Sequence, residues 1–278
     1  MLEILNLNKS FKNLEILKDI SVNLENGVYG LLGSNGAGKT TLIRCIVNLY
    51  NINKGIIKFN GTDIVNNDEF LKNIGYLPQK FGLFKELSVY DNLQYFCILK
   101  KIDKNSIDDN IKESLKMVNL EDRISHKVST LSGGMIRRLG IAQALLGNPQ
   151  ILIFDEPTAG LDPEERIRFK NILTCIKKDK LIIISTHIVE DVEASCNKII
   201  IMSNGRILKI GSAEEIESAA RGKVYEVEQE EADMDWYIEK NFVRDGKIFF
   251  RILSNKKEEY KSLEPTIEDG YMCIVKGI

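Results

Sequence analysis

A short segment near the amino terminus has residue types and spacing that can bind phosphate. It reads Gly33-Ser34-Asn35-Gly36-Ala37-Gly38-Lys39-Thr40 and is followed by Thr41, and all of these residues are candidate nucleotide contacts. Glycines let backbone N–H groups turn inward around phosphate oxygens. A helix that begins near Lys39 would direct the positive end of its dipole at the same anion. We expect Lys39 to reach the β- and γ-phosphates and the Thr40 hydroxyl to ligate Mg²⁺. A plain glycine-rich turn is the alternative.

Two adjacent carboxylates form the second candidate. Asp155 and Glu156 follow the apolar run 151–154, which has the composition of a buried strand. Two acids at such a position are costly unless a cation meets them, and a magnesium–nucleotide complex would supply that cation. Asp155 would hold the water shell of the metal, and Glu156 would polarise the attacking water. Because Pro157 follows, the alternative is a helix amino terminus capped by acids.

The phosphate-binding segment needs a strand before it and a helix after it. Residues 28–32 form a short apolar run, and residues 40–49 carry apolar side chains at helical spacing. Strand, loop and helix in this order build a phosphate-binding α/β unit. The alternation resumes with strands at 151–154 and 181–185 and a helix at 164–176 between them, so we expect these strands in the same sheet.

Other segments surround this unit. Residues 80 to about 145 consist mostly of polar, helix-like stretches, which predict a helical insertion between two strands of the main sheet. Apolar and polar residues alternate over 2–7, with a polar break at 8–10, and again over 16–24. These two segments predict strands of a small antiparallel sheet.

Two β-hairpins are predicted towards the carboxyl terminus. Strands near 198–202 and 206–210 flank Asn204-Gly205, and Asp245-Gly246 precedes another apolar run. Both dipeptides favour tight hairpin turns. Together with the acidic stretch 226–235, the second hairpin indicates a small α/β appendage after about residue 222.

Composition excludes several classes of protein. The 278 residues are 44% hydrophobic and 28% charged, as in a folded globular protein, and the net charge of −2 argues against a general nucleic-acid binder. No apolar run approaches the roughly 20 residues of a spanning helix. Polar residues near the start argue against a signal peptide, so we expect a cytosolic chain. The five scattered cysteines argue against a disulfide framework and against a zinc site.

A third motif identifies a family. Leu131-Ser132-Gly133-Gly134-Met135 is by itself a turn or helix-cap pattern. Together with the other two motifs, in this order, it makes residues 1 to about 215 resemble the ATP-binding cassette (ABC) ATPases. The segment resembles the signature motif of that family, which completes the site of the partner subunit. The resemblance implies that Ser132, Gly133 and Gly134 face the γ-phosphate of a nucleotide held by a second subunit.

Four further residues match positions of this family. Gln79 resembles the glutamine that senses Mg²⁺ and the attacking water. Asp162 ends a segment that resembles the loop crossing the dimer interface, and His187 resembles the switch histidine at the γ-phosphate. Phe11 stands where the family places an aromatic residue on the adenine, usually tyrosine. Their alternatives are a capping or surface role for His187 and a core position for Phe11.

Pattern and resemblance together predict an α/β fold with a P-loop NTPase core, an antiparallel β subdomain, an inserted α-helical subdomain and a small C-terminal α/β appendage. Residues 1–221 would form the nucleotide-binding domain, with the helical subdomain at about 80–145, and residues 222–278 an accessory domain. The resemblance implies an ATPase that uses ATP and Mg²⁺ and closes as a dimer, which we expect to be a homodimer. It would power a separate membrane permease from the cytoplasmic face of the cell membrane, with no nucleic-acid partner.

Transport direction and rival functions depend on weaker features. Met135 after the glycines and the run 264–269 resemble exporters of antibiotics and drugs, whereas importer ATPases more often carry Gln at position 135; we expect export. A soluble ABC protein acting on ribosomes or DNA usually has two cassettes, a long coiled coil or a basic surface. A non-hydrolysing regulatory cassette usually lacks the glutamate or the histidine, and this chain has Glu156 and His187.

Three apolar residues follow Gln79 at the entry to the helical insertion. The resemblance places the groove for a cytoplasmic helix of the permease at Phe81, Leu83 and Phe84. A surface that couples the two proteins would move when the site closes if it directly followed the residue that senses the γ-phosphate, here Gln79. The alternative is that these side chains pack the core of the insertion.

Overall fold

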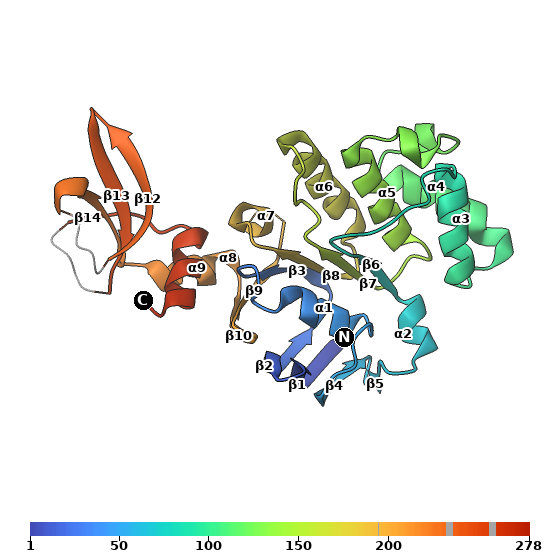
Figure 1. Ribbon diagram of the computed structural model, residues 1–278, viewed down its shortest axis with the longest axis horizontal. Helices are drawn as coiled ribbons and strands as arrows, with labels where there is room; N and C mark the ends of the chain where they lie inside the picture. The colour runs from blue at the N-terminus through green and yellow to red at the C-terminus, as the bar shows by residue number, and fades with distance from the viewer. Residues whose placement is uncertain (194, 232–235, 256–259) are drawn as a thin grey trace.

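A six-stranded sheet forms the centre of the molecule. The computed structural model describes residues 1–193, 195–231, 236–255 and 260–278 (Figure 1). In spatial order the strands are β10 (Arg206–Gly211), β9 (Lys198–Ser203), β3 (Gly27–Leu32), β8 (Leu181–Thr186), β7 (Ile151–Asp155) and β6 (Ile74–Leu77). All neighbours are parallel except β10, which pairs with β9 through the predicted hairpin at Asn204 and Gly205. Both of these residues have positive φ, as a tight turn between twisted strands requires.

Helices cover both faces of this sheet. On one face, Ile151, Ile153 and Ile183 pack in one cluster with side chains of α1 (Lys39–Ile46). On the other face, Phe154 and Ile184 pack with side chains of α5 (Gly133–Leu145) and α6 (Pro163–Ile176). Strands buried from both sides explain why these runs are apolar throughout. The predicted helix at 40–49 is shorter than expected, because the chain leaves the helix at Val47 and Asn48 has positive φ.

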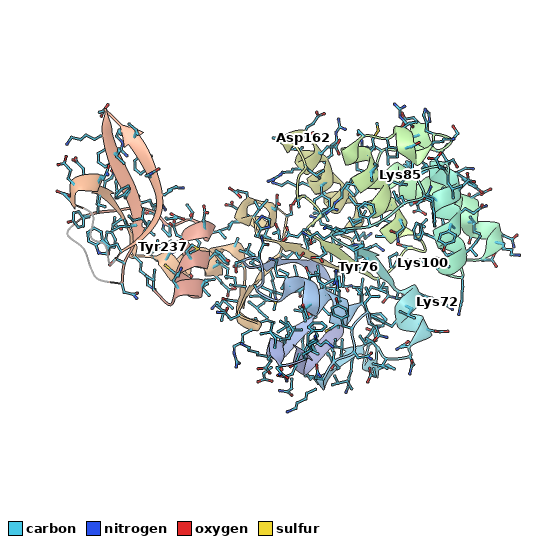
Figure 2. The ribbon with its side chains drawn as sticks, viewed as in Figure 1. Lys72, Tyr76, Lys85, Lys100, Asp162 and Tyr237 are labelled. Atoms are coloured by element: carbon cyan, nitrogen blue, oxygen red, sulfur yellow. The ribbon has the colours of Figure 1, made fainter. Side chains whose placement is uncertain are left out.

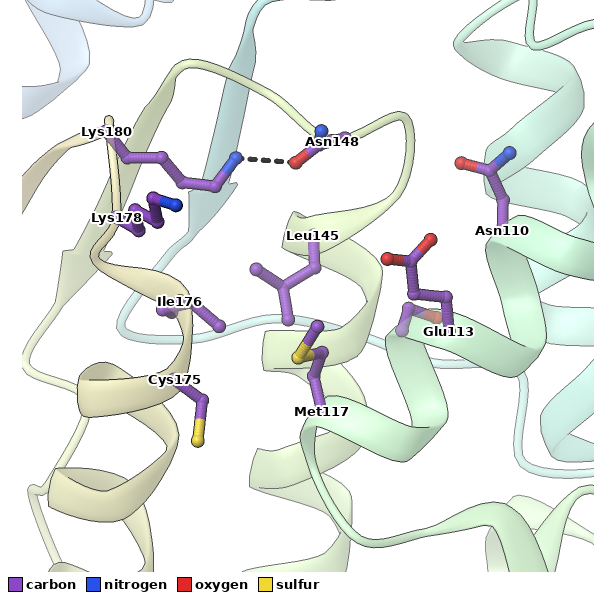
Figure 3. Close-up of a pocket in the computed structure, with 10 residues that line it drawn as sticks. Asn110, Glu113, Met117, Leu145, Asn148, Cys175, Ile176, Lys178 and Lys180 are labelled. Atoms are coloured by element: carbon purple, nitrogen blue, oxygen red, sulfur yellow. Dashed lines mark hydrogen bonds between the residues drawn. The ribbon is translucent and has the colours of Figure 1, made fainter.

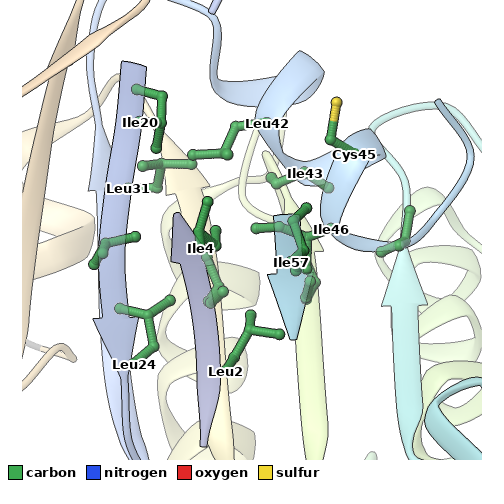
Figure 4. Close-up of a cluster of buried hydrophobic side chains, with 14 of the residues drawn as sticks. Leu2, Ile4, Ile20, Leu24, Leu31, Leu42, Ile43, Cys45, Ile46 and Ile57 are labelled. Carbon is green, nitrogen blue, oxygen red and sulfur yellow. The ribbon is translucent and has the colours of Figure 1, made fainter. Parts of the chain in front are cut away.

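A second, antiparallel sheet lies against α1. Its strands in spatial order are β2 (Leu14–Leu24), β1 (Leu2–Phe11), β4 (Lys54–Phe59) and β5 (Thr62–Asp63). Figure 4 shows Leu2, Ile4 and Ile20 of this sheet in one cluster with Leu42 and Ile43 of α1. The predicted break after residue 7 was wrong. Strand β1 continues to Phe11 through irregularities in its pairing, with Asn6 at positive φ, so bulges accommodate the polar residues.

The predicted helical insertion is confirmed, since β6 and β7 are neighbours and the chain between them is mostly helical. The helices are α3 (Val89–Leu99), α4 (Ile107–Met117) and α5, and a short α2 (Asp68–Lys72) precedes β6. Phe81 and Leu83 are half-buried and pack against the apolar core of these helices, whereas Phe84 is 48% exposed. The structure therefore separates three residues that the sequence analysis treated together.

The carboxyl-terminal part contains a third sheet. Short helices α7 (Val189–Glu193) and α8 (Ala213–Glu217) flank β9 and β10, and the sheet has the order β12 (Tyr237–Arg244), β13 (Lys247–Leu253), β11 (Val224–Glu228), β14 (Lys261–Ser262). The hairpin predicted at Asp245 and Gly246 joins β12 to β13, with positive φ at both residues. Helix α9 (Ile267–Lys276) packs between this sheet and α8 (Figure 1). Gly270 approaches so closely that a Cβ would lie 2.0 Å from the Ile216 carbonyl oxygen. Residues 232–235 of the acidic stretch lie outside the described residues.

Two expectations concern features spread along the chain. Among the described residues, no helix combines the length and apolar character needed to cross a bilayer. All five cysteines are free thiols, and Cys45, Cys97 and Cys273 are buried.

Candidate active site

The glycine-rich loop joins β3 to α1 at the carboxyl edge of the central sheet. Gly38 precedes the helix with a φ of 106°, a conformation that side chains disfavour, so glycine is required there. Lys39 is the first residue of α1, and its Nζ donates hydrogen bonds to the carbonyl oxygens of Gly33 (2.6 Å) and Ser34 (3.2 Å). Burial lowers the pKa of Lys39, while Glu156 and Asp155 oppose that shift. The loop and the lysine therefore share one site with the carboxylates.

Asp155 ends β7 beside the first turn of α1. Its Oδ1 accepts hydrogen bonds from the hydroxyls of Ser185 (2.5 Å) and Thr40 (3.3 Å). Its Oδ2 is buried and has no hydrogen-bond partner among the described residues. An unpaired buried carboxylate oxygen calls for a cation. Hard oxygen ligands such as these suit Mg²⁺, so the residues present fit that ion.

Glu156 follows at the next position with a strained backbone. Its φ is 50°, and its N–H donates to the carbonyl and hydroxyl oxygens of Ser185 on the neighbouring strand. Its carboxylate lies 3.0 Å from Nδ1 of His187 and 3.7 Å from Nζ of Lys39. A left-handed backbone at a glutamate persists only where its surroundings hold it in place.

Of these side chains, Lys39, Thr40 and Glu156 border one open pocket of about 430 Å³, and Asp155 and His187 contact Thr40 and Glu156 of its wall. The wall consists of Ile16, Ser34, Asn35, Gly36, Gly38, Lys39, Thr40, Thr41, Gln79 and Glu156. Gln79 also lines the pocket. It follows β6, which is separated from β3 and the glycine-rich loop by β8 and β7. The sequence analysis expected Phe11 to contact the adenine. It did not predict Ile16, which lines the pocket.

Nine of the predicted site residues lie outside this wall. Gly33 and Ala37 belong to the loop itself, Asp155 and His187 contact the wall residues Thr40 and Glu156, and the other five are Phe11, Ser132, Gly133, Gly134 and Asp162. Phe11 is 41% exposed and packs edge-on against Tyr50, with ring centroids 5.2 Å apart. Ser132 caps the amino terminus of α5, where its Oγ accepts the N–H of Met135 at 3.3 Å. Gly133 and Gly134 are the first two residues of the same helix. Asp162 caps α6 and lies at the surface (Figure 2).

Ser185 is a site residue that spacing alone does not reveal. It stands opposite Asp155 in the parallel register of β7 and β8, and it bonds both Asp155 and Glu156. The one signal in the sequence is a hydroxyl at the end of a buried apolar strand. Arg137 was missed in the same way, although it contacts both Gln79 and Glu156.

A second cavity, of about 130 Å³, lies between α4, α5 and α6 (Figure 3). Several of its polar side chains bind other protein atoms, as when Lys180 Nζ donates to Asn148 Oδ1 at 2.6 Å and to the Pro149 carbonyl oxygen at 2.7 Å. None of the residues predicted to do chemistry lines this cavity. The chemistry therefore belongs to the pocket at the carboxyl edge of the sheet.

The fold and this pocket define a P-loop ATPase. A model of the ABC transporter family matches residues 17–159, and the chain belongs to that family as an ATP-binding, ATP-hydrolysing protein. The spermidine/putrescine import ATP-binding protein PotA of Fusobacterium nucleatum is 35% identical; the match covers 89% of this chain and 64% of that protein. The molybdate/tungstate import ATP-binding protein WtpC of Methanocaldococcus jannaschii is 36% identical, and the match covers 81% of this chain and 75% of that protein.

Solved structures agree with this assignment. The cbiO1 subunit from Clostridium perfringens, part of the cbiONQ transporter complex, has a TM-score of 0.71 and 29% identity, over 77% of this chain and 89% of that one. A bacterial ABC transporter cassette solved as a dimer has a TM-score of 0.69 and 26% identity, over 76% of this chain and 98% of that one.

Proposed function

We propose that this chain powers export through a separate membrane permease, from the cytoplasmic face of the membrane, by ATP-driven closure of a homodimer. The observation that supports this most is that Lys39, Thr40, Gln79 and Glu156 line one pocket, with Asp155 hydrogen-bonded to Thr40. Residues 1–221 are proposed as the nucleotide-binding domain, with the helical subdomain at about 80–145. Residues 222–278 would be an accessory domain.

Binding of the nucleotide falls to the glycine-rich loop and Lys39. The loop N–H groups and the amino terminus of α1 would receive the phosphates, and Lys39 would exchange its carbonyl partners for phosphate oxygens. Thr40, Asp155 and Gln79 would hold Mg²⁺. When bound, this ion would neutralise the charge that develops on the phosphate oxygens.

Hydrolysis falls to Glu156. Its carboxylate borders the pocket and would take the proton of the attacking water. His187 would orient that carboxylate through the contact at Nδ1, and Gln79 would place the water.

Dimer closure would account for the positions of Ser132, Gly133, Gly134 and Asp162, which lie outside the pocket wall. Ser132 and Gly133 are exposed at the amino terminus of a long helix, and Asp162 is exposed at the start of another. An exposed helix amino terminus can bind a phosphate that a second subunit brings. Two such subunits, head to tail, would enclose two nucleotides. Phe11 would complete the adenine site from its exposed position.

Two observations bear on the direction of transport. Met135 and the run 264–269 favour export, whereas the spermidine/putrescine and molybdate/tungstate relatives are named as import proteins. Import is therefore the competing direction. The permease that co-purifies with the tagged chain can be tested in inverted vesicles. ATP-dependent accumulation inside them supports export, and ATP-dependent depletion contradicts it.

Dimer closure is tested with Glu156→Gln. Loss of the base should slow turnover by roughly 10²–10⁴-fold while ATP still binds. ATP then stays in place, so size-exclusion chromatography should show a dimer with ATP and a monomer without it. Near-normal turnover, or a monomer with bound ATP, would contradict the proposal.

A further inference from the structure

Arg137 on α5 makes an unusual set of contacts for a charged residue. Its guanidinium donates to three backbone carbonyls: Nε to Pro157 at 2.8 Å, Nη1 to Gln79 at 3.2 Å, and Nη2 to Glu156. Among the ion pairs of the described residues, none includes Arg137. Two of the three carbonyls belong to residues whose side chains border the nucleotide pocket.

From these contacts we propose that Arg137 is a positioning residue that ties helix α5 to Gln79 and Glu156 of the same subunit. The proposal rests on the function proposed above. Arg137 lies one helical turn after Gly133, at the end of α5 that would face the nucleotide of the partner subunit. A displacement of this helix on dimer closure would therefore move the backbone of both residues.

The chemistry of these contacts requires arginine. Three carbonyls in different directions need several donors in a rigid fork, which a guanidinium provides and a lysine ammonium does not. The ring of Phe81 lies under the guanidinium, with the centroid 5.7 Å from Cζ. Burial lowers the pKa of Arg137, while Asp155 and Glu156 oppose the shift. A guanidinium stays charged in proteins.

The contact with Glu156 involves strained backbone. A φ of 50° at this residue is held by two bonds from its own N–H to Ser185 and by the bond that its carbonyl accepts from Arg137. Release of the carbonyl would allow the peptide to relax and the carboxylate to turn away from the pocket. Arg137 therefore acts on the general base without touching the substrate.

The neighbouring arginine has a different set of contacts. Arg138 Nη1 donates to the carbonyls of Val118 (3.0 Å) and Asn119 (2.9 Å), and its Nε lies 3.3 Å from a carboxylate oxygen of Glu165. These contacts join α5 to the end of α4 and to α6. Arg138 thus serves packing of the helical insertion, whereas Arg137 serves the site.

A heterodimer with one hydrolysing subunit distinguishes a positioning role of Arg137 from a general role in folding. One tagged subunit carries Glu156→Gln, so that only the other subunit can hydrolyse ATP. We then place Arg137→Met in the hydrolysing subunit or in the Glu156→Gln subunit. The first arrangement should lower turnover by roughly tenfold to a hundredfold, as a misplaced reacting group does, with ATP affinity unchanged. With Arg137→Met in the Glu156→Gln subunit, turnover should fall less than about threefold, because Glu156 of the hydrolysing subunit stays in place. Equal losses in both arrangements would overturn the proposal.

Two further variants complete the test. Arg137→Lys keeps the charge but not the fork, so it should lose turnover as Arg137→Met does, with a melting temperature like that of wild type. Arg168→Gln, a partly exposed arginine of α6, is the control and should keep full turnover. Full turnover in Arg137→Met, or a loss of ATP binding with a lowered melting temperature, overturns the positioning role. A wild-type chain without ATPase activity would instead overturn the proposed function.

Discussion

The imidazole Nδ1 of His187 lies 3.0 Å from the Oε2 of Glu156, across the ends of two neighbouring parallel strands. The histidine follows β8 and the glutamate follows β7, so the sheet register alone brings them together. Nζ of Lys39, the first residue of α1, lies 3.7 Å from Oε1 of the same carboxylate. The orientation of Glu156 therefore depends on two neighbours from different parts of the chain.

Removal of the imidazole should impair hydrolysis more than binding. In His187→Ala the Glu156 carboxylate loses the partner that orients it, and kcat should fall by roughly tenfold to a hundredfold. Nucleotide affinity, measured by calorimetry, should stay within a factor of about three, since the phosphate contacts remain. His126, the only other histidine, is the matched control, and His126→Ala should keep wild-type kcat. Unchanged turnover in His187→Ala would contradict this assignment.

Loss of the Asp155 charge should weaken the response to Mg²⁺. Asp155→Asn keeps the size of the side chain but leaves the buried Oδ2 position neutral. The Mg²⁺ concentration for half-maximal turnover should rise roughly tenfold to a hundredfold. Calorimetry gives an independent measure: wild-type ATP affinity should drop when the metal is chelated, and that of Asp155→Asn should drop much less. An equal drop in both proteins would exclude Asp155 as a metal-site residue.

Phe84 should matter for a partner and not for folding. Its backbone is held by the buried Asn92, which accepts the Phe84 N–H at 2.9 Å and donates to its carbonyl oxygen at 3.0 Å. Its ring is 48% exposed beside Tyr95, with centroids 5.1 Å apart. Phe84→Ala should therefore melt like wild type and keep basal turnover, but lose stimulation by the proposed permease.

Phe81→Ala is the control for this prediction. Phe81 packs so closely that a Cβ on Gly140 would lie 2.6 Å from its ring, and its truncation should lower the melting temperature. A similar drop in Phe84→Ala would show that Phe84 belongs to the core of the insertion.

Sequence reasoning succeeded where the signal is local and failed where it depends on register. The loop between β3 and α1 and the buried strand before Asp155 follow from glycine spacing and apolar runs. The continuation of β1 past residue 7 depends on pairing with β2 and β4, which the polar residues at 8–10 do not reveal. Ser185, Ile16 and Arg137 reach the site through strand register and helix packing, so no spacing in the sequence identifies them.

A buried acid pair with one arginine joins the carboxyl-terminal sheet to α9: Glu239 lies on β12 and Asp269 on α9. Arg251 on β13 lies 3.1 Å from a Glu239 oxygen through Nε, and its Nη2 donates to Asp269 Oδ2 at 2.5 Å. Both carboxylates are nearly inaccessible, and Tyr237 and Glu268 lie nearby. Burial, reinforced by Asp269, raises the pKa of Glu239 to about 8. One arginine thus accompanies two acids, of which Glu239 keeps its proton at neutral pH.

This raised pKa predicts that stability declines with alkaline pH. An unfolded glutamate releases its proton near pH 4.3, whereas the folded chain holds it to about pH 8. The folded state binds the extra proton between these values, so the free energy of unfolding falls across this window and levels off above it. In Glu239→Gln the neutral amide replaces the acid, so thermal melting between pH 6 and 9 should show a shallower decline. At pH 8.5 the variant should melt no lower than wild type. Glu228→Gln is the control. Glu228 pairs with Lys247 and is more exposed than Glu239, so this variant should keep the wild-type slope. An unchanged slope in Glu239→Gln would assign the pH dependence to other groups.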